Sequence, residues 1–272
     1  MGMHMNVDSE IFVEIGGKSY LIASDDDYLE HIRNGFEPGL VQIFKSLVSE
    51  NDTILDVGAN IGCSAILFGE LSKQVYAFEP SPTTFAFLEK NIKNSGLHNI
   101  SLNNVGLGDK AGSFTLTFSP ANRSGGFVSD RTRANADHTV ENIQVTTMDD
   151  FVSKLGIACV NFIKIDVEGY EGHVLRGASE TLGAFKPTVV LELNHWCLNA
   201  FQRTSIPDFF DYLRSIFPIL LAIDSSGYLN LHDQDESYTV MYNHIINMRF
   251  QNIVAAFDEN RLDRFRALKQ HL

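Results

Sequence analysis

Apolar positions follow two different periods along this chain. Short, near-continuous apolar runs at 53–57, 74–78 and 161–165 predict strands that are buried on both faces. In 63–71 and 82–95, apolar residues instead recur at the spacing of a helix. Because strands alternate with helices every ~20–30 residues, the pattern predicts an α/β protein with a mostly parallel sheet and helices on both faces.

Other segments extend this picture. Alternating residues at 10–15 and 18–23, separated by two glycines, predict an N-terminal β-hairpin, and 40–48 has helical spacing. Further strands are expected at 100–107, 113–118, 140–145, 187–193, 219–223 and 252–257, and further helices at 148–155, 169–182, 209–217 and 260–272.

The polar stretch 119–138 is long for a connection and predicts either a functional flap or a mobile insertion. Its arginines, among them Arg123, Arg131 and Arg133, could grip a carboxylate or phosphate on a substrate. A disordered surface loop is the alternative.

Composition and charge narrow the class of protein. Of the 272 residues, 44% are hydrophobic and 20% are charged, which is typical of a globular protein with a sizeable core. The formal net charge of −13 repels phosphate backbones and anionic membranes, so we expect neither nucleic acid nor a membrane as a partner.

Cys63, Cys159 and Cys197 form no CxxC pair, which favours a reducing compartment. No signal peptide and no membrane-length apolar run is apparent, so we expect a cytoplasmic protein.

The segment from Thr53 to Leu71 contains the clearest binding motif. A strand, a glycine turn and a helix in this order form a nucleotide-type pocket at the carboxyl end of a strand. The dinucleotide pattern GxGxxG is not matched, because Asn60 stands where it needs glycine after Gly58, and Gly62 follows. We therefore expect a ligand that approaches the backbone closely but carries no pyrophosphate.

Acidic residues follow three of the predicted strands. Asp56 would repel phosphate and favour an amine or a cation, and S-adenosylmethionine has both and no phosphate. Glu79, at the end of the second strand, is placed to accept hydrogen bonds from two ribose hydroxyls. Asp109, after the third strand, is placed to reach an adenine edge. Each residue alone could be a helix cap or part of a turn, but together they point into one crevice.

Four segments make the chain resemble a known family. "LDVGANIGCSAILFG", "VYAFEPSPTTFAFLEKNIKNSG", "NVGLGDKAG" and the stretch ending in "IKIDVEGYEGHVLRGA" are similar to the FkbM family of S-adenosylmethionine-dependent methyltransferases. The resemblance extends from the N-terminal hairpin to about Leu193. It implies a class I Rossmann-like methyltransferase fold, with a seven-stranded, mostly parallel sheet, helices on both faces, and an N-terminal β-hairpin and helix. We expect three parts: a hairpin and helical extension (1–50), the Rossmann-like domain (51–258) and a C-terminal helix (259–272).

The resemblance also assigns roles to matching positions. Gly58, Asn60 and Gly62 would cradle the methionine part of the cofactor, with Asp56 near its amine. Glu79 would hold the ribose, Asp109 would lie by the adenine, and Asp166 would face the transferred methyl group. Lys164, Glu168 and Glu171 belong to the same motif without an assigned role.

Methyl transfer to a hydroxyl needs a base within hydrogen-bond reach and an aligned donor and acceptor. Asp166 is the first candidate as base or acceptor-orienting group, and His195 is the second, since an imidazole titrates near neutral pH. The alternative is that His195 is a partly exposed histidine at a strand end without a catalytic role.

Trp196 could form a wall of the acceptor pocket, or it could only pack against neighbouring side chains. Asp166, Glu192 and Asn194 could supply oxygen ligands to Mg²⁺, but they form no tight cluster, so no metal site is predicted.

The sequence thus predicts an S-adenosylmethionine-dependent methyltransferase, with a hydroxyl of a small molecule, natural product, sugar or glycan as the acceptor. Two alternatives stay open. A nicotinamide-dependent oxidoreductase would share the acidic ribose contact, and a non-catalytic methyltransferase-like binding module would keep the cofactor segment. A homo-oligomer is also open.

Overall fold

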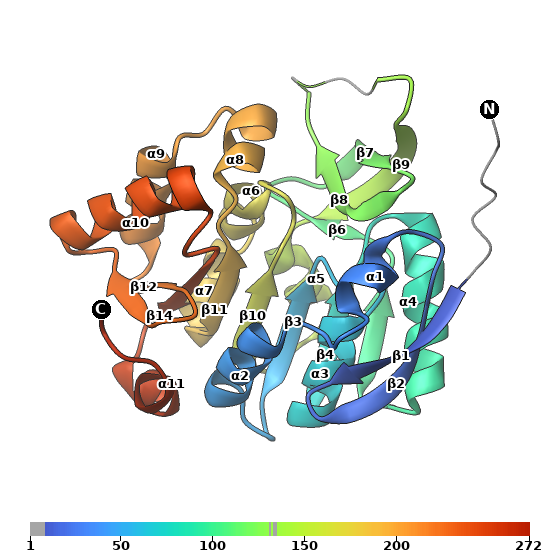
Figure 1. Cartoon of the computed structure of the whole chain (residues 1–272), viewed down its shortest axis with the longest axis horizontal. Coiled ribbons are helices and arrows are strands. Elements are labelled where there is room, and N and C mark those ends of the chain that lie inside the picture. Colours follow the sequence, from blue (N-terminus) through green and yellow to red (C-terminus); the bar gives the residue numbers. More distant parts are fainter. Residues whose placement is uncertain (1–8, 131, 133–134) are drawn as a thin grey trace.

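The protein is built around one large sheet. The computed structural model describes residues 9–130, 132 and 135–272, and its eight-stranded sheet runs through the middle of the molecule (Figure 1). In spatial order the strands are β13 (Tyr228–Asn230), β12 (Ile219–Ile223), β14 (Asn252–Ala256), β11 (Thr188–Glu192), β10 (Phe162–Ile165), β3 (Thr53–Val57), β4 (Gln74–Phe78) and β5 (Ile100–Asn103). β3, β4, β5, β10 and β11 are parallel, and β14 runs antiparallel to both of its neighbours.

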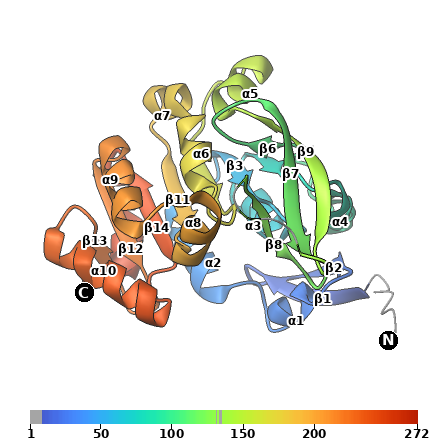
Figure 2. The ribbon, with the colours of Figure 1, turned by 90° about the horizontal axis from the view of Figure 1, so that it is seen from above.

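Two layers of helices cover this sheet because its central strands are apolar on both faces. All five residues of β3 are buried; Ile54 packs into one core, whereas Leu55 and Val57 pack into the other. The layers lie on opposite sides of the strands, as the view from above shows (Figure 2). The first contains α2 (Pro38–Leu47), α3 (Cys63–Leu71), α4 (Pro82–Ser95), the 3-10 helix η1 (Glu259–Leu262) and α11 (Asp263–Leu268). The second contains α5 (Met148–Leu155), α6 (Glu171–Arg176), α7 (Ser179–Phe185), α9 (Ile206–Ile216) and α10 (Gln234–Asn247).

The N-terminal hairpin is present as predicted. β1 (Ser9–Ile15) and β2 (Lys18–Ser24) pair antiparallel and continue into the short helix α1 (Tyr28–Ile32). The buried side chain of Asn91 in α4 joins this hairpin to the domain. It accepts a hydrogen bond from Ala23 N at 2.8 Å and donates to the carbonyls of Ala23 and Ile61 at 3.0 and 2.9 Å.

A second, four-stranded sheet stands above the carboxyl edge of the large one (Figure 1). Its order is β6 (Gly106–Leu107), β9 (Thr139–Thr146), β7 (Gly112–Ser119) and β8 (Asn122–Val128). α8 (His195–Gln202) packs against the outer strand β8, where Phe127 and Phe201 stack with ring centroids 3.8 Å apart. Much of the polar stretch predicted as a flap or a mobile insertion is therefore an ordered strand.

The structure corrects several predicted elements. The large sheet has eight strands instead of seven, because β13 adds to its edge. The single strand expected at 100–107 is two strands in different sheets, since Asn104 turns the chain by donating hydrogen bonds to the carbonyls of Glu79 and Pro80. The single helix expected at 169–182 is α6 and α7. It breaks at Gly177, where a Cβ would collide with the carbonyl oxygen of Gly108.

The C-terminal part differs as well. The helix expected at 260–272 is the short pair η1 and α11. α8 and α10 were not predicted. The division at residues 50 and 258 stays a prediction. Within the described part of the chain, no helix combines the length and the apolar character that crossing a membrane requires.

Candidate functional site

A cavity of about 270 Å³ opens at the carboxyl edge of the large sheet, between this edge and the small sheet. The chain runs from β3 outward to β4 and β5, and then returns to β10 on the other side of β3. Ligands of open α/β sheets bind at such a switch point. The ends of β3, β4, β10 and β11 contribute Gly58, Glu79, Asp166 and Glu192 to the lining, and the small sheet contributes residues such as Ser124.

The turn after β3 brings backbone atoms to the cavity. Gly58 has φ +80°, and a Cβ there would collide with the carbonyl oxygen of Asp166, so only glycine fits. Asn60 also has positive φ, and its side chain lines the cavity. Gly62 begins α3 with φ +103°, but it packs against Leu88 and does not line the cavity. Gly58 and Asn60 thus line the cavity and Gly62 supports the turn, and their contact with the methionine part of a cofactor stays a prediction.

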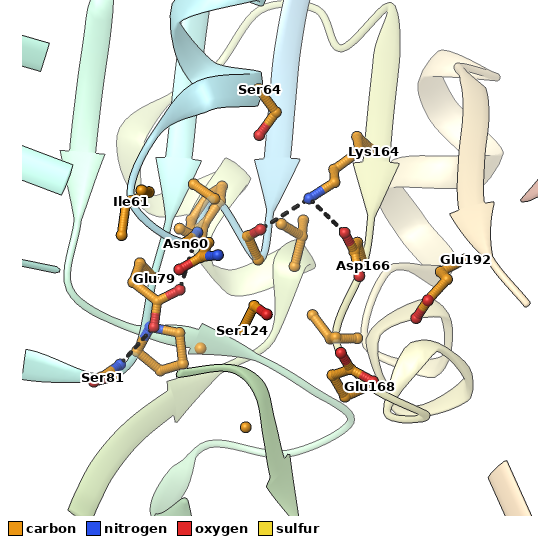
Figure 3. A pocket seen from close by; sticks show the side chains of 18 of the residues that line it. Asn60, Ile61, Ser64, Glu79, Ser81, Ser124, Lys164, Asp166, Glu168 and Glu192 are labelled. Atoms are coloured by element: carbon orange, nitrogen blue, oxygen red, sulfur yellow. Dashed lines mark hydrogen bonds and ion pairs between the residues drawn. The ribbon is translucent and has the colours of Figure 1, made fainter. Parts of the chain in front are cut away.

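Glu79 fixes the end of β4. Its carboxylate accepts hydrogen bonds from Asn60 N at 3.1 Å and from Ser81 N at 2.9 Å (Figure 3). Burial raises the pKa of Glu79 to about 7, although these two backbone donors oppose the shift. The carboxyl group therefore titrates near neutral pH.

Lys164 lies between two acidic groups beneath the glycine turn. Its ammonium donates to the carbonyl of Gly58 at 2.8 Å and lies 3.6 Å from Asp56. It also lies 3.3 Å from Asp166 (Figure 3). Burial favours the neutral amine, but the carboxylates of Asp166 and Asp56 outweigh it and raise the pKa of Lys164. Lys164 is therefore a charged group that ties β10 to the glycine turn.

Asp56 is fully buried and does not line the cavity. It accepts a hydrogen bond from Ser64 at 2.8 Å, and burial raises its pKa while Lys164 opposes the shift. The structure therefore directs Asp56 toward Lys164 and Ser64, and not into the cavity.

Three carboxyl groups gather on the side of the cavity opposite Glu79 (Figure 3). They belong to Asp166, which is 46% exposed at its side chain, to Glu168 and to Glu192. Burial, followed by the charge of Asp166, raises the pKa of Glu168 to about 7. Burial and the neighbouring carboxylates raise that of Glu192 as well.

Backbone geometry presents Glu168 to the cavity. Glu168 has φ +51°, a backbone conformation that residues other than glycine rarely adopt. Buried Glu171 stabilises this turn by accepting hydrogen bonds from the backbone N–H groups of Val167 and Gly169 at 3.1 and 3.3 Å. Glu171 therefore serves the loop, and Glu168 faces the cavity.

Three other predicted residues lie elsewhere. Asp109 is not among the lining residues; its carboxylate contacts His173 at 2.9 Å and Arg176 at 3.8 Å, so it faces α6 and not the cavity. His195, the first residue of α8, does not line the cavity either. Its backbone N–H donates to His244 Nε2 at 3.2 Å, and its Nδ1 is buried without a partner among the described residues. Trp196 is 60% exposed and stacks edge-on with Phe201, outside the cavity wall.

Arg123 lines the cavity, but its guanidinium is already bound. It donates to both carboxylate oxygens of Asp25 at 2.7 Å, and its backbone N–H donates to Asp26 at 2.9 Å. It also donates to Thr83 at 2.7 Å. Asp25 and Asp26 thus form a clasp with Arg123 that fastens β8 to the N-terminal segment. The other arginines named above, 131 and 133, lie outside the described residues.

We expect the Arg123→Ala variant to lower the free energy of unfolding by about 1–2 kcal/mol, because it breaks a partly buried bidentate pair. Chemical denaturation measures this change. Asp25→Asn and the double variant complete a double-mutant cycle. A coupling energy of zero would show that the clasp contributes nothing.

The sequence did not single out some residues of this cavity. Tyr28 and Glu37 reach it from the N-terminal segment, and Ser124 and Gly126 reach it from β8. The length and polarity of the stretch after Ser119 were the signal for Ser124 and Gly126, and the sequence analysis found no signal for Tyr28 and Glu37. Contacts across such sequence distances are set by packing and not by local pattern.

Comparison with known proteins places the chain among methyltransferases. A family model described as the methyltransferase FkbM domain matches residues 56–228, more than half of the chain. Three curated relatives are similar. The hexuronic acid methyltransferase AglP of Haloferax volcanii is 29% identical over 57% of this chain and 61% of its own length. The 2-O-methyltransferase NoeI of Sinorhizobium fredii is 29% identical over 52% and 63%. The 31-O-demethyl-FK506 methyltransferase FkbM of Streptomyces tacrolimicus is 32% identical over 47% and 60%. The chain thus spans somewhat less than two thirds of the length of these relatives.

Proposed function

Since the chain belongs to the methyltransferase FkbM domain family, we propose that it is an S-adenosylmethionine-dependent methyltransferase that acts on a hydroxyl group of a small molecule or glycan. The observation that carries this proposal is the arrangement of residues around the cavity. The turn after β3 requires glycine at position 58, and the buried carboxylate of Glu79 lies across the cavity from Asp166. The names of two relatives support oxygen as the acceptor atom, since one is a 2-O-methyltransferase and the other is a methyltransferase of 31-O-demethyl-FK506.

The lining residues fit this cofactor. Glu79 can accept hydrogen bonds from ribose hydroxyls, and the turn at Gly58 and Asn60 gives close access to backbone atoms. The cavity offers no free cation for a pyrophosphate: within the described lining, Lys164 and Arg123 are the cationic side chains, and both are bound to carboxylates. When bound, S-adenosylmethionine supplies a methyl group activated by the sulfonium charge.

The chain's own residues would then align the acceptor. Lys164 holds Asp166 at the end of β10, where the carboxylate can orient an acceptor hydroxyl. The small sheet covers the cavity through residues such as Leu116 and Val128, which reduces access of water. Asp166 is thus our proposed catalytic residue. For His195 the same role stays a prediction, and its position outside the lining does not favour it.

The Asp166→Asn variant tests this assignment. We expect it to bind S-adenosylhomocysteine like the wild type and to lose most methyl transfer. Transfer is followed by mass spectrometry of products that gain one labelled methyl group from a panel of metabolites and glycans. Unchanged turnover in the variant would refute the role of Asp166.

The cellular setting is also a proposal. We propose a cytoplasmic enzyme without a nucleic-acid or membrane partner, on the basis of its net charge of −13 and its free cysteines. Size-exclusion chromatography with light scattering would determine whether it forms a homo-oligomer.

A further inference from the structure

The charged side chains that line the cavity restrict which acceptor can bind. Of the charged side chains that line the described cavity, five are acidic: Glu37, Glu79, Asp166, Glu168 and Glu192. The cations Lys164 and Arg123 are bound to Asp56, Asp166 and Asp25, as described above. A carboxylate or phosphate on the acceptor would therefore find no free positive charge, and would be repelled by those of the acidic groups that are ionised.

Glu192 has an unused polar atom at the side of the cavity opposite Glu79. Its Oε2 is shielded from solvent and has no hydrogen-bond partner among the described residues, although Glu192 lines the cavity. A buried carboxyl oxygen without a partner is unfavourable, so such an atom points to a ligand that supplies the missing hydrogen bond. Figure 3 shows the Glu192 side chain pointing toward the same space as Glu168.

Glu168 is held in place through one oxygen. Its Oε2 accepts hydrogen bonds from Asn194 Nδ2 at 3.3 Å and from Cys197 Sγ at 3.1 Å. No described residue donates to its Oε1, which leaves this oxygen for a ligand. Asn194 and Cys197 lie at the start of α8, so the helix that packs on β8 also orients this carboxyl group.

We propose that Glu168 and Glu192 form the acceptor subsite, that Glu168 takes the proton of the acceptor hydroxyl, and that the acceptor carries no negative charge. The inference rests on the proposed methyltransferase function and makes it more specific. As the oxygen–carbon bond forms, the bond from the methyl carbon to sulfur breaks, its electron pair stays on sulfur, and the hydroxyl proton moves to Glu168. The pKa of Glu168, which burial raises to about 7, suits a base at neutral pH.

Matched acceptors test the charge restriction. Neutral methyl glycosides, the corresponding amino sugars and the corresponding uronates, which share one ring, are incubated with labelled S-adenosylmethionine. We expect transfer to the neutral and amino sets and at least about tenfold slower transfer to the uronates, as a like-charge contact opposes binding. Equal or faster transfer to the uronates overturns the inference, and so does a lack of transfer to all three sets by a protein that binds S-adenosylhomocysteine.

Isosteric variants test the two side chains. Glu168→Gln should bind S-adenosylhomocysteine like the wild type, lower kcat about 10²–10⁴-fold and remove the rise of kcat with pH around neutrality. Glu192→Gln should mainly raise KM for the acceptor, and Glu89→Gln, the same change on the exposed face of α4, is the control. An unchanged kcat and pH profile in Glu168→Gln overturns the proton transfer.

A measurement without an acceptor completes the test. In protein labelled with ¹³C at the glutamate side-chain carboxyl carbons and saturated with S-adenosylhomocysteine, we expect that Glu168 and Glu79 both give resonances that titrate near neutral pH, and that the Glu168 resonance disappears in Glu168→Gln. Its absence overturns the role of Glu168. Failure to bind S-adenosylhomocysteine at all refutes the proposed function instead, so the two failures are distinguishable.

Discussion

Replacing Lys164 by Met should lower the free energy of unfolding by about 3–5 kcal/mol, the usual effect of removing one partner of a buried ion pair. Lys164 is 8% exposed at its side chain and is the cation nearest to Asp56, which is fully buried. Without Lys164, Asp56 keeps the hydrogen bond from Ser64. Its buried Oδ1, which has no hydrogen-bond partner among the described residues, then also loses the positive charge beside it. Urea denaturation followed by circular dichroism measures the loss.

The pH dependence of this loss identifies its cause. Burial raises the pKa of Asp56 in the folded state above its value in the unfolded chain, and removal of Lys164 raises it further. For an acid with a raised pKa, stability is present at low pH and is lost as pH rises. The deficit of Lys164→Met should therefore shrink toward acid pH, and Lys164→Met with Asp56→Asn should recover part of it. A deficit that is independent of pH would attribute the effect to packing alone.

Replacing Glu79 by Gln should weaken binding of S-adenosylhomocysteine about 10–100-fold, because it removes charge-assisted hydrogen bonds to the ribose. Gln keeps one oxygen that can accept from Asn60 N or Ser81 N, so the turn should still fold. Isothermal titration calorimetry measures the affinity. Glu89→Gln is again the control, and an unchanged affinity in Glu79→Gln would contradict the assignment of the ribose contact.

The same carboxyl group should make binding depend on pH. Since the pKa of Glu79 is raised to about 7, lowering the pH below this value protonates it and removes one acceptor for the ribose hydroxyls. We expect the affinity of the wild type to fall as pH decreases through neutrality, and that of Glu79→Gln to stay nearly constant over the same range. Parallel profiles for the two proteins would show that Glu79 does not titrate in this range.

Local patterns predicted most of the central sheet, and packing determined the rest. β3, β4 and β10 are mostly apolar runs, because their residues are largely buried, and their position in the sequence is therefore clear. β8 has the sequence NRSGGFV, which shows no strand pattern, since its partner β7 and the clasp at Arg123 hold it in place. α10 buries only Ser237, Val240 and His244 and thus lacks an apolar stripe facing the core.

The candidate site was predicted in part for the same reason. Gly58, Asn60, Glu79 and Asp166 follow strands directly, so the strand ends determine their position. Asp109 also follows a strand, but β6 leaves the large sheet and turns Asp109 toward α6. Asp56 precedes the end of its own strand, so its side chain enters the core beside Lys164. Glu192 ends β11 and is positioned by that strand. Glu168 instead depends on the strained turn after β10 and on α8, which no sequence period indicates.

The most direct test of the central proposal is a titration of the purified protein with S-adenosylhomocysteine and with NAD under the same conditions. We predict saturable 1:1 binding of S-adenosylhomocysteine that Glu79→Gln weakens, and no comparable binding of NAD, because the turn lacks the glycines of a pyrophosphate site. Tighter binding of NAD than of S-adenosylhomocysteine would contradict the account and favour the nicotinamide-dependent oxidoreductase.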